Sequence, residues 1–255
     1  MSLRSSPWAT GVPCWIDLRT PDLATAQEVY AQLFEWDYRT GDGFAIATKD
    51  GAAVAALLAA DEPSGTWTMY VASDDAAATA EAVAANGGTV VVAPGAVGDF
   101  GRACHVTDPA GAAFGIWQYG TSIGAELINE PGALVWEDLA VSGPRAVQPF
   151  YTRVFDWHFG PMPQAGSEYA LIMGTDPFPL GGIGPTEPGQ APGWRIYIGV
   201  TDTDETVALM TAQGGSVVRP ALTTPYGRHA ILADPGGAVF SVIETDRSTQ
   251  PERSG

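Results

Sequence analysis

The sequence predicts an α+β protein made of two similar domains in tandem, each a pair of βαβββ modules that form a curled, mostly antiparallel sheet. Three observations support this fold class. The chain has 255 residues, which is longer than one typical domain, and 45% of them are hydrophobic, enough for two packed cores. A segment near the start recurs after the middle. In each copy, strand-like and helix-like stretches alternate in the same order.

The repeat is clearest at the start of the two copies, where GVPCWIDLRTPDLATAQEVYAQLFEWDY corresponds to GALVWEDLAVSGPRAVQPFYTRVFDWHF without gaps. Trp15 and Trp136 give an offset of 121 (136 minus 15). Trp67 and Trp194 give an offset of 127 (194 minus 67), so six extra residues (127 minus 121) enter the second copy around residues 161–167. Near the end, DPAGAAFGIWQ corresponds to DPGGAVFSVIE. So many matches in the same order indicate a duplicated domain.

Within the first copy, PCWIDL is typical of a strand, and residues 22–34 are typical of a helix with Asp22 as its N-cap and an apolar face. The stretches GFAIAT, AAVAALLA and TWTMYVAS predict strands, and DDAAATAEAVAANGG predicts a helix that Gly87 and Gly88 end. We expect an N-terminal tail at 1–10, the first domain at 11–118, a linker at 119–132, the second domain at 133–245 and a C-terminal tail at 246–255.

Composition limits the class of partner. The net charge of −17 argues against nucleic acid or an anionic membrane, because both would be repelled over most of the surface. Two cysteines, Cys14 and Cys104, are too few for a disulfide framework or a structural zinc site. The sequence has neither the apolar run of a secretory signal nor a stretch long enough to span a bilayer. We therefore expect a soluble cytoplasmic protein.

The duplicated βαβββ order, the LFEW and VFDW helix ends, and the DPxGxxF turn before each last strand resemble the vicinal oxygen chelate superfamily of glyoxalases, bleomycin-resistance proteins and extradiol dioxygenases. The chain is also similar to the two-domain actinobacterial branch of glyoxalase-like proteins described as hydroxylases. The motifs that carry this similarity are WIDL, WTMYV and FGR in the first copy, with WEDL and YGR as counterparts in the second. The resemblance covers nearly the whole chain. It implies the fold more firmly than the reaction, because this superfamily contains lyases, dioxygenases, epimerases, thiol transferases and drug-binding proteins.

Enzymes of this superfamily hold a divalent metal inside the curled sheet with His, Gln or Glu ligands. The resemblance places the ligand positions at residues that are not usual metal ligands: Trp15, Trp67 and Gly115 in the first copy, and Trp136, Trp194 and Ser241 in the second. A fourth position would fall in AAVAALLA or FPLGGIG, which contain no carboxylate or imidazole. We therefore expect no metal and no other cofactor. A new site formed by Asp17 with His105 is the alternative, although a lone histidine on a strand is more often structural.

The curled sheet of each domain encloses a concave face, which we call the cup. Residues two apart on a strand point to the same face, so the sequence predicts which side chains line each cup. The predicted set is Trp15, Asp17, Trp67, Met69, Gly115 and Trp117 in the first copy, and Trp136, Asp138, Trp194, Ile196, Ser241 and Ile243 in the second. Indoles around a gap left by Gly115 or Ser241 would form a slot for a flat molecule, and the first copy offers the better slot. The alternative is that the tryptophans fill the volume of a lost metal and leave no cavity.

An aspartate on an inward strand face needs a partner. Asp17 is a candidate general base with a raised pKa, or a holder of a ligand hydroxyl or amine. It is equally a candidate for structural pairing with backbone N–H groups or with Arg102. Arg102 and Arg228 begin late strands near the cup mouths, where we expect them to pair with Asp17 and Asp138 or to contact an anionic substrate.

Three functions are consistent with these residues. The first is a metal-independent protein that binds a small, flat aromatic or natural-product molecule. The second is a metal-independent hydroxylase-like, lyase or isomerase enzyme of secondary metabolism that uses Asp17 and Arg102. The third, least favoured, is a metal-dependent glyoxalase I type lyase or dioxygenase. The fused copies predict a monomer with an internal pseudo-dimer, with a homodimer as the alternative.

Overall fold

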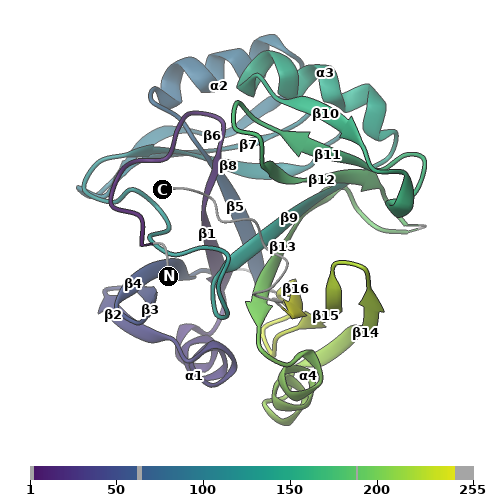
Figure 1. Cartoon of the computed structure of the whole chain (residues 1–255). Helices are drawn as coiled ribbons and strands as arrows, with labels where there is room; N and C mark the ends of the chain where they lie inside the picture. Colours follow the sequence, from purple (N-terminus) through teal and green to yellow (C-terminus); the bar gives the residue numbers. More distant parts are fainter. Residues whose placement is uncertain (1–2, 62–64, 188, 245–255) are drawn as a thin grey trace.

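The computed structural model describes residues 3–61, 65–187 and 189–244 and shows two mixed sheets, one from each half of the chain (Figure 1). This confirms the predicted tandem α+β fold. The expected C-terminal tail at 246–255 lies outside the described residues. The first half contains β1 (Pro13–Thr20), α1 (Leu23–Phe34), β2 (Asp37–Gly41), β3 (Phe44–Lys49) and β4 (Ala52–Ala59), followed by β5 (Thr66–Ala72), α2 (Ala76–Ala85), β6 (Thr89–Val97), β7 (Gly101–Thr107) and β8 (Ala113–Tyr119).

The second half repeats this order. The extra residues of the second copy form a short 3-10 turn, η1 (Pro163–Ala165), before the third strand of the copy. Its other elements are β9 (Leu134–Val141), α3 (Pro144–Phe155), β10 (His158–Pro161), β11 (Ala170–Met173), β12 (Pro179–Pro185), β13 (Gly193–Val200), α4 (Thr203–Ala212), β14 (Ser216–Thr224), β15 (Gly227–Ala233) and β16 (Val239–Glu244).

Both sheets have the same topology. The first has the strand order β2-β3-β4-β1-β5-β8-β7-β6, and the second has β10-β11-β12-β9-β13-β16-β15-β14. The two modules of each domain join through the antiparallel pair β1–β5 or β9–β13. Within the first sheet, β1 runs parallel to β4 and β5 parallel to β8, while the remaining pairs are antiparallel.

The first helix forms as its sequence predicts. Asp22 is the N-cap, and its carboxylate accepts a hydrogen bond from the backbone N–H of Thr25 at 3.0 Å. The buried residues of the helix are spaced at intervals of three or four, which places them on one face: Ala26, Val29, Tyr30, Leu33 and Phe34. None of the helices in the described chain is long and apolar enough to cross a membrane.

The helix-bearing sides of the two sheets pack against each other and share one hydrophobic core. Helix α1 lies beside α4, and α2 lies beside α3 (Figure 1). A reciprocal pair of hydrogen bonds links the halves. The Tyr30 hydroxyl donates to Asp234 Oδ2 at 2.9 Å, and the Tyr151 hydroxyl donates to Asp108 Oδ2 at 3.0 Å. Each copy therefore uses the helix tyrosine of one domain to hold the DPxG turn of the other.

Candidate functional site

The first cup face is the side of the first sheet that faces away from the helices. Strand register defines it. Trp15 on β1 lies directly opposite Tyr70 on β5, and Tyr70 lies opposite Gly115 on β8. His105 on β7 lies opposite Gly115 in turn. These side chains share one face with Asp17, two residues from Trp15.

Two predicted members of this lining, Trp67 and Met69, lie on the opposite face. They are registered with Leu18 and Ile16 in the core between the domains, and the Trp67 indole N–H donates to the Tyr30 hydroxyl at 3.1 Å. The reason is parity, because Trp67 is an odd number of residues from Tyr70. The middle position of the cup is therefore Tyr70 rather than Trp67.

The same correction applies to the second copy. Trp194 lies edge-on to Tyr151 in the interdomain core, and Ile196 is buried in that core. Trp136 and Ser241 both lie opposite Tyr197, so Tyr197 takes the middle position of the second cup.

Gly115 leaves no slot in the first cup. A Cβ added there would lie 2.0 Å from the Tyr70 ring, so the glycine exists to let that ring lie flat against β8. Trp15 and Trp117 are each 7% exposed and Tyr70 is 3% exposed. The predicted opening between Trp15, Trp67 and Gly115 is therefore wrong, and the packed alternative describes this cup.

Chain segments from outside the sheet complete the packing of the first cup. Trp8, Ala125 and Ile128 pack against its aromatic residues. The backbone N–H of Ala125 donates to the Cys14 carbonyl, and that of Glu126 to the Ala53 carbonyl, so the segment bridges β1 and β4. We call residues 122–128 the strap. The strap seals the first cup.

Asp17 is buried within this sealed cup. Its Oδ2 accepts a hydrogen bond of 2.6 Å from the Tyr70 hydroxyl, whose oxygen lies 3.4 Å from His105 Nε2. Burial raises the pKa of Asp17 to about 7 against the lowering effect of the Tyr70 hydrogen bond. Asp17 Oδ1 makes no full hydrogen bond among the described residues, and the Thr68 side chain opposite it lowers the pKa of Asp17 only slightly. Asp17 and His105 therefore approach each other only through Tyr70.

The second cup face is built around Asp138. The Trp136 indole N–H and the Tyr169 hydroxyl donate to Oδ1 at 3.0 and 2.6 Å, and the Tyr197 hydroxyl donates to Oδ2 at 2.8 Å. Burial, and after it the Asp138 charge, raises the pKa of both tyrosines, so both remain neutral donors. One carboxylate thus fixes three aromatic rings.

Two glycines of β12 make room for the Tyr169 ring. A Cβ on Gly182 would lie 1.8 Å from the Tyr169 hydroxyl oxygen, and one on Gly184 would lie 2.9 Å from its ring. Residues two apart share a strand face, so these glycines form a shallow track that the ring occupies. The spacing in FPLGGIG is the sequence signal for this ring.

The second cup face is more exposed than the first. Trp136, Asp138, Tyr169 and Tyr197 are half-buried, whereas Trp15, Asp17 and Tyr70 in the first cup are buried. Ile243 shares the face, because it lies opposite His229 on β15. The accessible aromatic surface thus lies in the second copy, although the sequence pattern favours the first.

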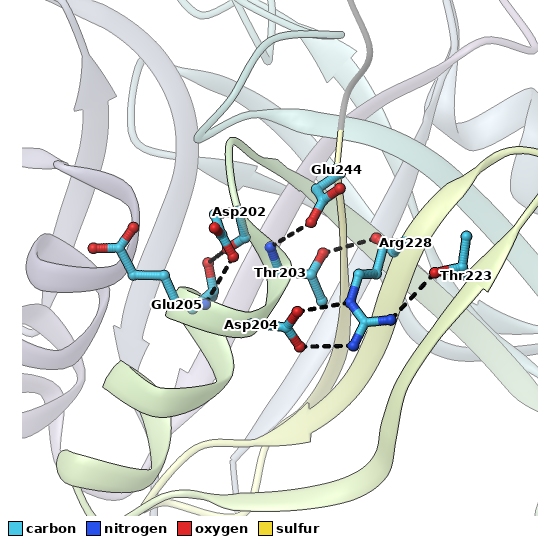
Figure 2. A network of polar contacts seen from close by, with 8 residues as sticks. Asp202, Thr203, Asp204, Glu205, Thr223, Arg228 and Glu244 are labelled. Atoms are coloured by element: carbon cyan, nitrogen blue, oxygen red, sulfur yellow. Dashed lines mark hydrogen bonds and ion pairs between the residues drawn. The ribbon is translucent and has the colours of Figure 1, made fainter.

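Neither predicted arginine reaches an aspartate of its cup. Arg102 is exposed and lies opposite Gln118, on the other face from Trp117, and its guanidinium donates to the Pro94 carbonyl at 3.4 Å. Figure 2 shows that Arg228 instead forms a two-pronged ion pair with Asp204 at 2.8 and 2.9 Å. This network fastens the start of α4 to β14, β15 and β16, which supports the structural interpretation of Arg228.

The donor set does not fit a divalent metal. The three neighbouring positions that face each cup are Trp15, Tyr70 and Gly115, or Trp136, Tyr197 and Ser241. The hydroxyls of Tyr70 and Tyr197 are already bound to aspartates. Across the described residues, no three His, Cys, Asp or Glu side chains gather as metal ligands would.

Two hollows on the described surface lie outside both cups. One, of about 390 Å³, lies over α3 and is lined by Arg145, Gln148, Pro149, Thr152, Arg153 and Phe159. The other, of about 220 Å³, lies where the start of α1 meets residues 234–236. Neither contains a residue of the cup lining.

Family models match both halves of the chain. The model described as Glyoxalase/Bleomycin resistance protein/Dioxygenase superfamily matches residues 14–116, and the model described as Glyoxalase-like domain matches residues 136–243.

Named relatives match almost end to end. The chain is 37% identical over 254 residues to "Putative glyoxylase CFP32" of Mycobacterium tuberculosis, covering 94% of this chain and 97% of that protein. It is 33% identical over 273 aligned positions to "Anthracycline biosynthesis protein DnrV" of Streptomyces peucetius, covering 93% and 94%.

Solved structures share the fold at low identity. The Mn(II)-bound glyoxalase from Novosphingobium aromaticivorans has a TM-score of 0.66 at 16% identity, with 92% of this chain and 82% of that chain covered. The 2,3-dioxygenase LapB from Pseudomonas sp. KL28 has a TM-score of 0.63 at 14% identity, with coverage of 95% and 97%.

Proposed function

Since this chain belongs to the glyoxalase/bleomycin resistance protein/dioxygenase superfamily, we propose that it binds a small planar aromatic molecule, without a metal, on the second cup face. The observation that carries the proposal is the aromatic group around Asp138, in which Trp136, Tyr169 and Tyr197 are each fixed by a hydrogen bond and remain half-buried. Aromatic side chains with locked positions offer large contact area at a low entropic cost.

The relatives support the class of ligand. DnrV is named an anthracycline biosynthesis protein, and the anthraquinone part of an anthracycline is planar. Ring stacking on Trp136 suits a molecule of this shape, and the phenol and indole edges turned toward Asp138 leave ring faces for apolar contact.

Metal independence rests on the ligand positions described above. Elemental analysis of protein purified without chelator tests it. We expect less than about one tenth of an equivalent of iron, zinc, manganese or nickel. A stoichiometric amount of any one of them in repeated preparations would overturn this part of the proposal.

Binding is tested by titrating the full chain with a panel of planar aromatic compounds that includes an anthracycline. A ligand at about 100 times its Kd should stabilise the protein by about 2.7 kcal/mol and quench tryptophan fluorescence. Replacing Trp136 by Phe should remove most of the quench and keep the thermal shift. The matched Trp15→Phe variant in the sealed cup should keep both. A panel in which no compound quenches or stabilises would refute the proposal.

One observation favours an enzyme as the second candidate. Asp17 holds a carboxylate with a pKa of about 7 and a buried oxygen that makes no full hydrogen bond among the described residues, which suits a general base. Because the strap seals the first cup, Asp17 reaches a substrate only when the strap moves away. If the chain turns over an aromatic compound in that opened cup, Asp17→Asn should abolish the reaction and leave the affinity of the second cup face nearly unchanged. Full activity of that variant would eliminate Asp17 as the base.

A further inference from the structure

The second cup face carries two arginines, one of them without an ion-pair partner among the described residues, in a chain that is strongly acidic. The chain has 12 basic and 29 acidic residues. Yet Arg195 on β13 and Arg219 on β14 both face this cup. Arg195 lies opposite Asp138, and Arg219 lies opposite Ile231, which itself lies opposite Ser241. His229 is on the same face, next to the Tyr197 ring.

Arg195 is not neutralised by a contact. Asp138 opposite it is occupied by Trp136, Tyr169 and Tyr197. In the part of the chain that the structure describes, Arg195 takes part in no hydrogen bond or ion pair, although it is half-buried. Arg219, by contrast, pairs with Glu187. A half-buried guanidinium with free donors is suited to an anionic group brought by a ligand.

Two neighbouring groups add hydrogen-bonding capacity without charge. Ser241 is fully buried beside Tyr197, and its hydroxyl interacts with the Tyr197 hydroxyl without the geometry of a full hydrogen bond. Burial, together with the charge of Arg219, lowers the pKa of His229, so its imidazole is neutral at pH 7. The half-buried His229 imidazole can donate to or accept from a polar ligand group, and Ser241 lies beneath the Tyr197 position.

The first copy serves as an internal control, because its sealed cup lacks this set. Thr68 lies opposite Asp17 where Arg195 lies opposite Asp138. Val92 lies opposite His105 where Arg219 lies opposite Ile231. Ala103 takes the position of His229, at the repeat offset of 126 (229 minus 103). The arginines opposite Asp138 and Ile231 therefore belong to the half-exposed cup only, whereas the basic residue on the first cup face is Arg19 of β1, two residues from Asp17.

We propose that the second cup face recognises an organic anion, namely a planar aromatic molecule whose carboxylate or ionised phenol is bound by the guanidinium of Arg195. The inference rests on the proposed function and specifies its ligand class. The aromatic rings fix the plane of the ligand, and Arg195 selects its charge. The guanidinium donates in a planar fork that matches a carboxylate.

A matched pair of probes tests this inference. Anthraquinone-2-carboxylate and anthraquinone-2-carboxamide have the same ring system and differ in charge. Titrated into the full chain at pH 7 and low salt, the acid should bind roughly 10 to 100 times more tightly than the amide, as expected for one charge-assisted hydrogen-bonded contact. Raising the ionic strength should reduce this preference only in part, because Arg195 is half-buried.

Arg195→Gln should reduce the acid's affinity to that of the amide and leave the amide unchanged. Arg153→Gln is the matched control, because Arg153 is exposed on α3 away from the cup, and it should keep the full preference. Circular dichroism of each variant checks folding, and Arg195→Lys provides a second variant that keeps the charge and should keep part of the preference.

The outcomes separate the two proposals. If wild-type protein binds acid and amide equally, or if Arg195→Gln keeps the preference for the acid, the inference is overturned while aromatic binding stands. If neither probe binds and no other member of the aromatic panel does, both the proposed function and this inference are overturned.

Discussion

The reciprocal tyrosine contacts between the domains should differ in strength, although the repeat makes them equivalent. Tyr30→Phe removes a hydroxyl that donates to Asp234 and accepts from the Trp67 indole N–H. A hydrogen bond to a charged group contributes about 1.5–3 kcal/mol, and a buried donor left without a partner costs about 1–3 kcal/mol more. We therefore expect Tyr30→Phe to lower the free energy of unfolding by about 2.5–6 kcal/mol.

Tyr151→Phe removes one hydrogen bond only. The Tyr151 hydroxyl donates to Asp108, while the indole N–H of Trp194, which corresponds to that of Trp67, approaches the Tyr151 hydroxyl without the geometry of a full hydrogen bond. The expected cost is about 1.5–3 kcal/mol, smaller than that of Tyr30→Phe by about 1–3 kcal/mol.

Urea unfolding, followed by circular dichroism and by tryptophan fluorescence, measures both costs. The two signals should change together, because one hydrophobic core spans both domains. The double variant should show the sum of the single effects, because the two contacts share no partner. A cost for Tyr151→Phe that equals or exceeds that of Tyr30→Phe would refute this reasoning.

Three further predictions follow from the cups. Burial raises the pKa of Asp17 from 3.8 to about 7, so wild-type protein should lose about 3 kcal/mol of stability relative to Asp17→Asn as pH rises from 4 to 7, and the loss should level off above about pH 8. Urea curves that keep a constant difference between the two proteins across this range would contradict it. Gly115→Ala should destabilise by about 1–3 kcal/mol through collision with Tyr70, whereas Gly160→Ala, with nothing within 4 Å, should be nearly neutral by the same measurement. Arg228→Gln should change probe affinity by less than about 2-fold in the titration, since it pairs with Asp204 outside the cup, and a large loss would restore it as a ligand residue.

The sequence predicts the parts of this fold that depend on local chemistry. Asp22 caps α1 because its carboxylate is one turn from free N–H groups. Asp108 closes the DPAG turn by accepting from the N–H groups of Ala110 and Ala112. Its second oxygen holds Tyr151 from the other domain, and no local pattern predicts that contact. Contacts between the copies depend on how the two sheets pack.

The cup lining shows that a prediction of which strand face a residue occupies fails when the alignment is wrong by one residue. The sequence pattern places Trp15, Asp17 and Trp117 on the cup face, where the structure also has them. Asp17 lies two residues from Trp15, and Trp117 lies two residues from Gly115, so each shares the face of its neighbour. Trp67 fails, because an alignment that is shifted by an odd number exchanges the two faces of a strand. Tyr70, which the same strand carries three residues later, is the residue that reaches Asp17.

The sealing of the first cup depends on a segment that has no periodic signal. The predicted linker at 119–132 has glycines and polar residues, and its sequence does not indicate that Ala125 and Leu127 become buried. The strap hydrogen bonds to the backbone of Cys14 and Ala53, where β1 and β4 separate. Its position is set by strand carbonyl groups that lack a partner within the sheet, and the backbone N–H groups of any sequence can donate to them.

The two faces of each sheet are under different constraints, and this accounts for the divergence of the cups. The helix-bearing faces need each other, because Tyr30 and Tyr151 each hold a turn of the opposite domain and the core is continuous across both copies. Neither copy can lose its helix side without exposing the core of its partner. The cup faces carry no such mutual requirement. One could therefore be packed shut by the strap and Trp8, while the other kept accessible rings around Asp138 and acquired Arg195. In this interpretation the first copy acts mainly as the structural partner of the second, and substitutions that open the first cup should affect stability before they affect binding.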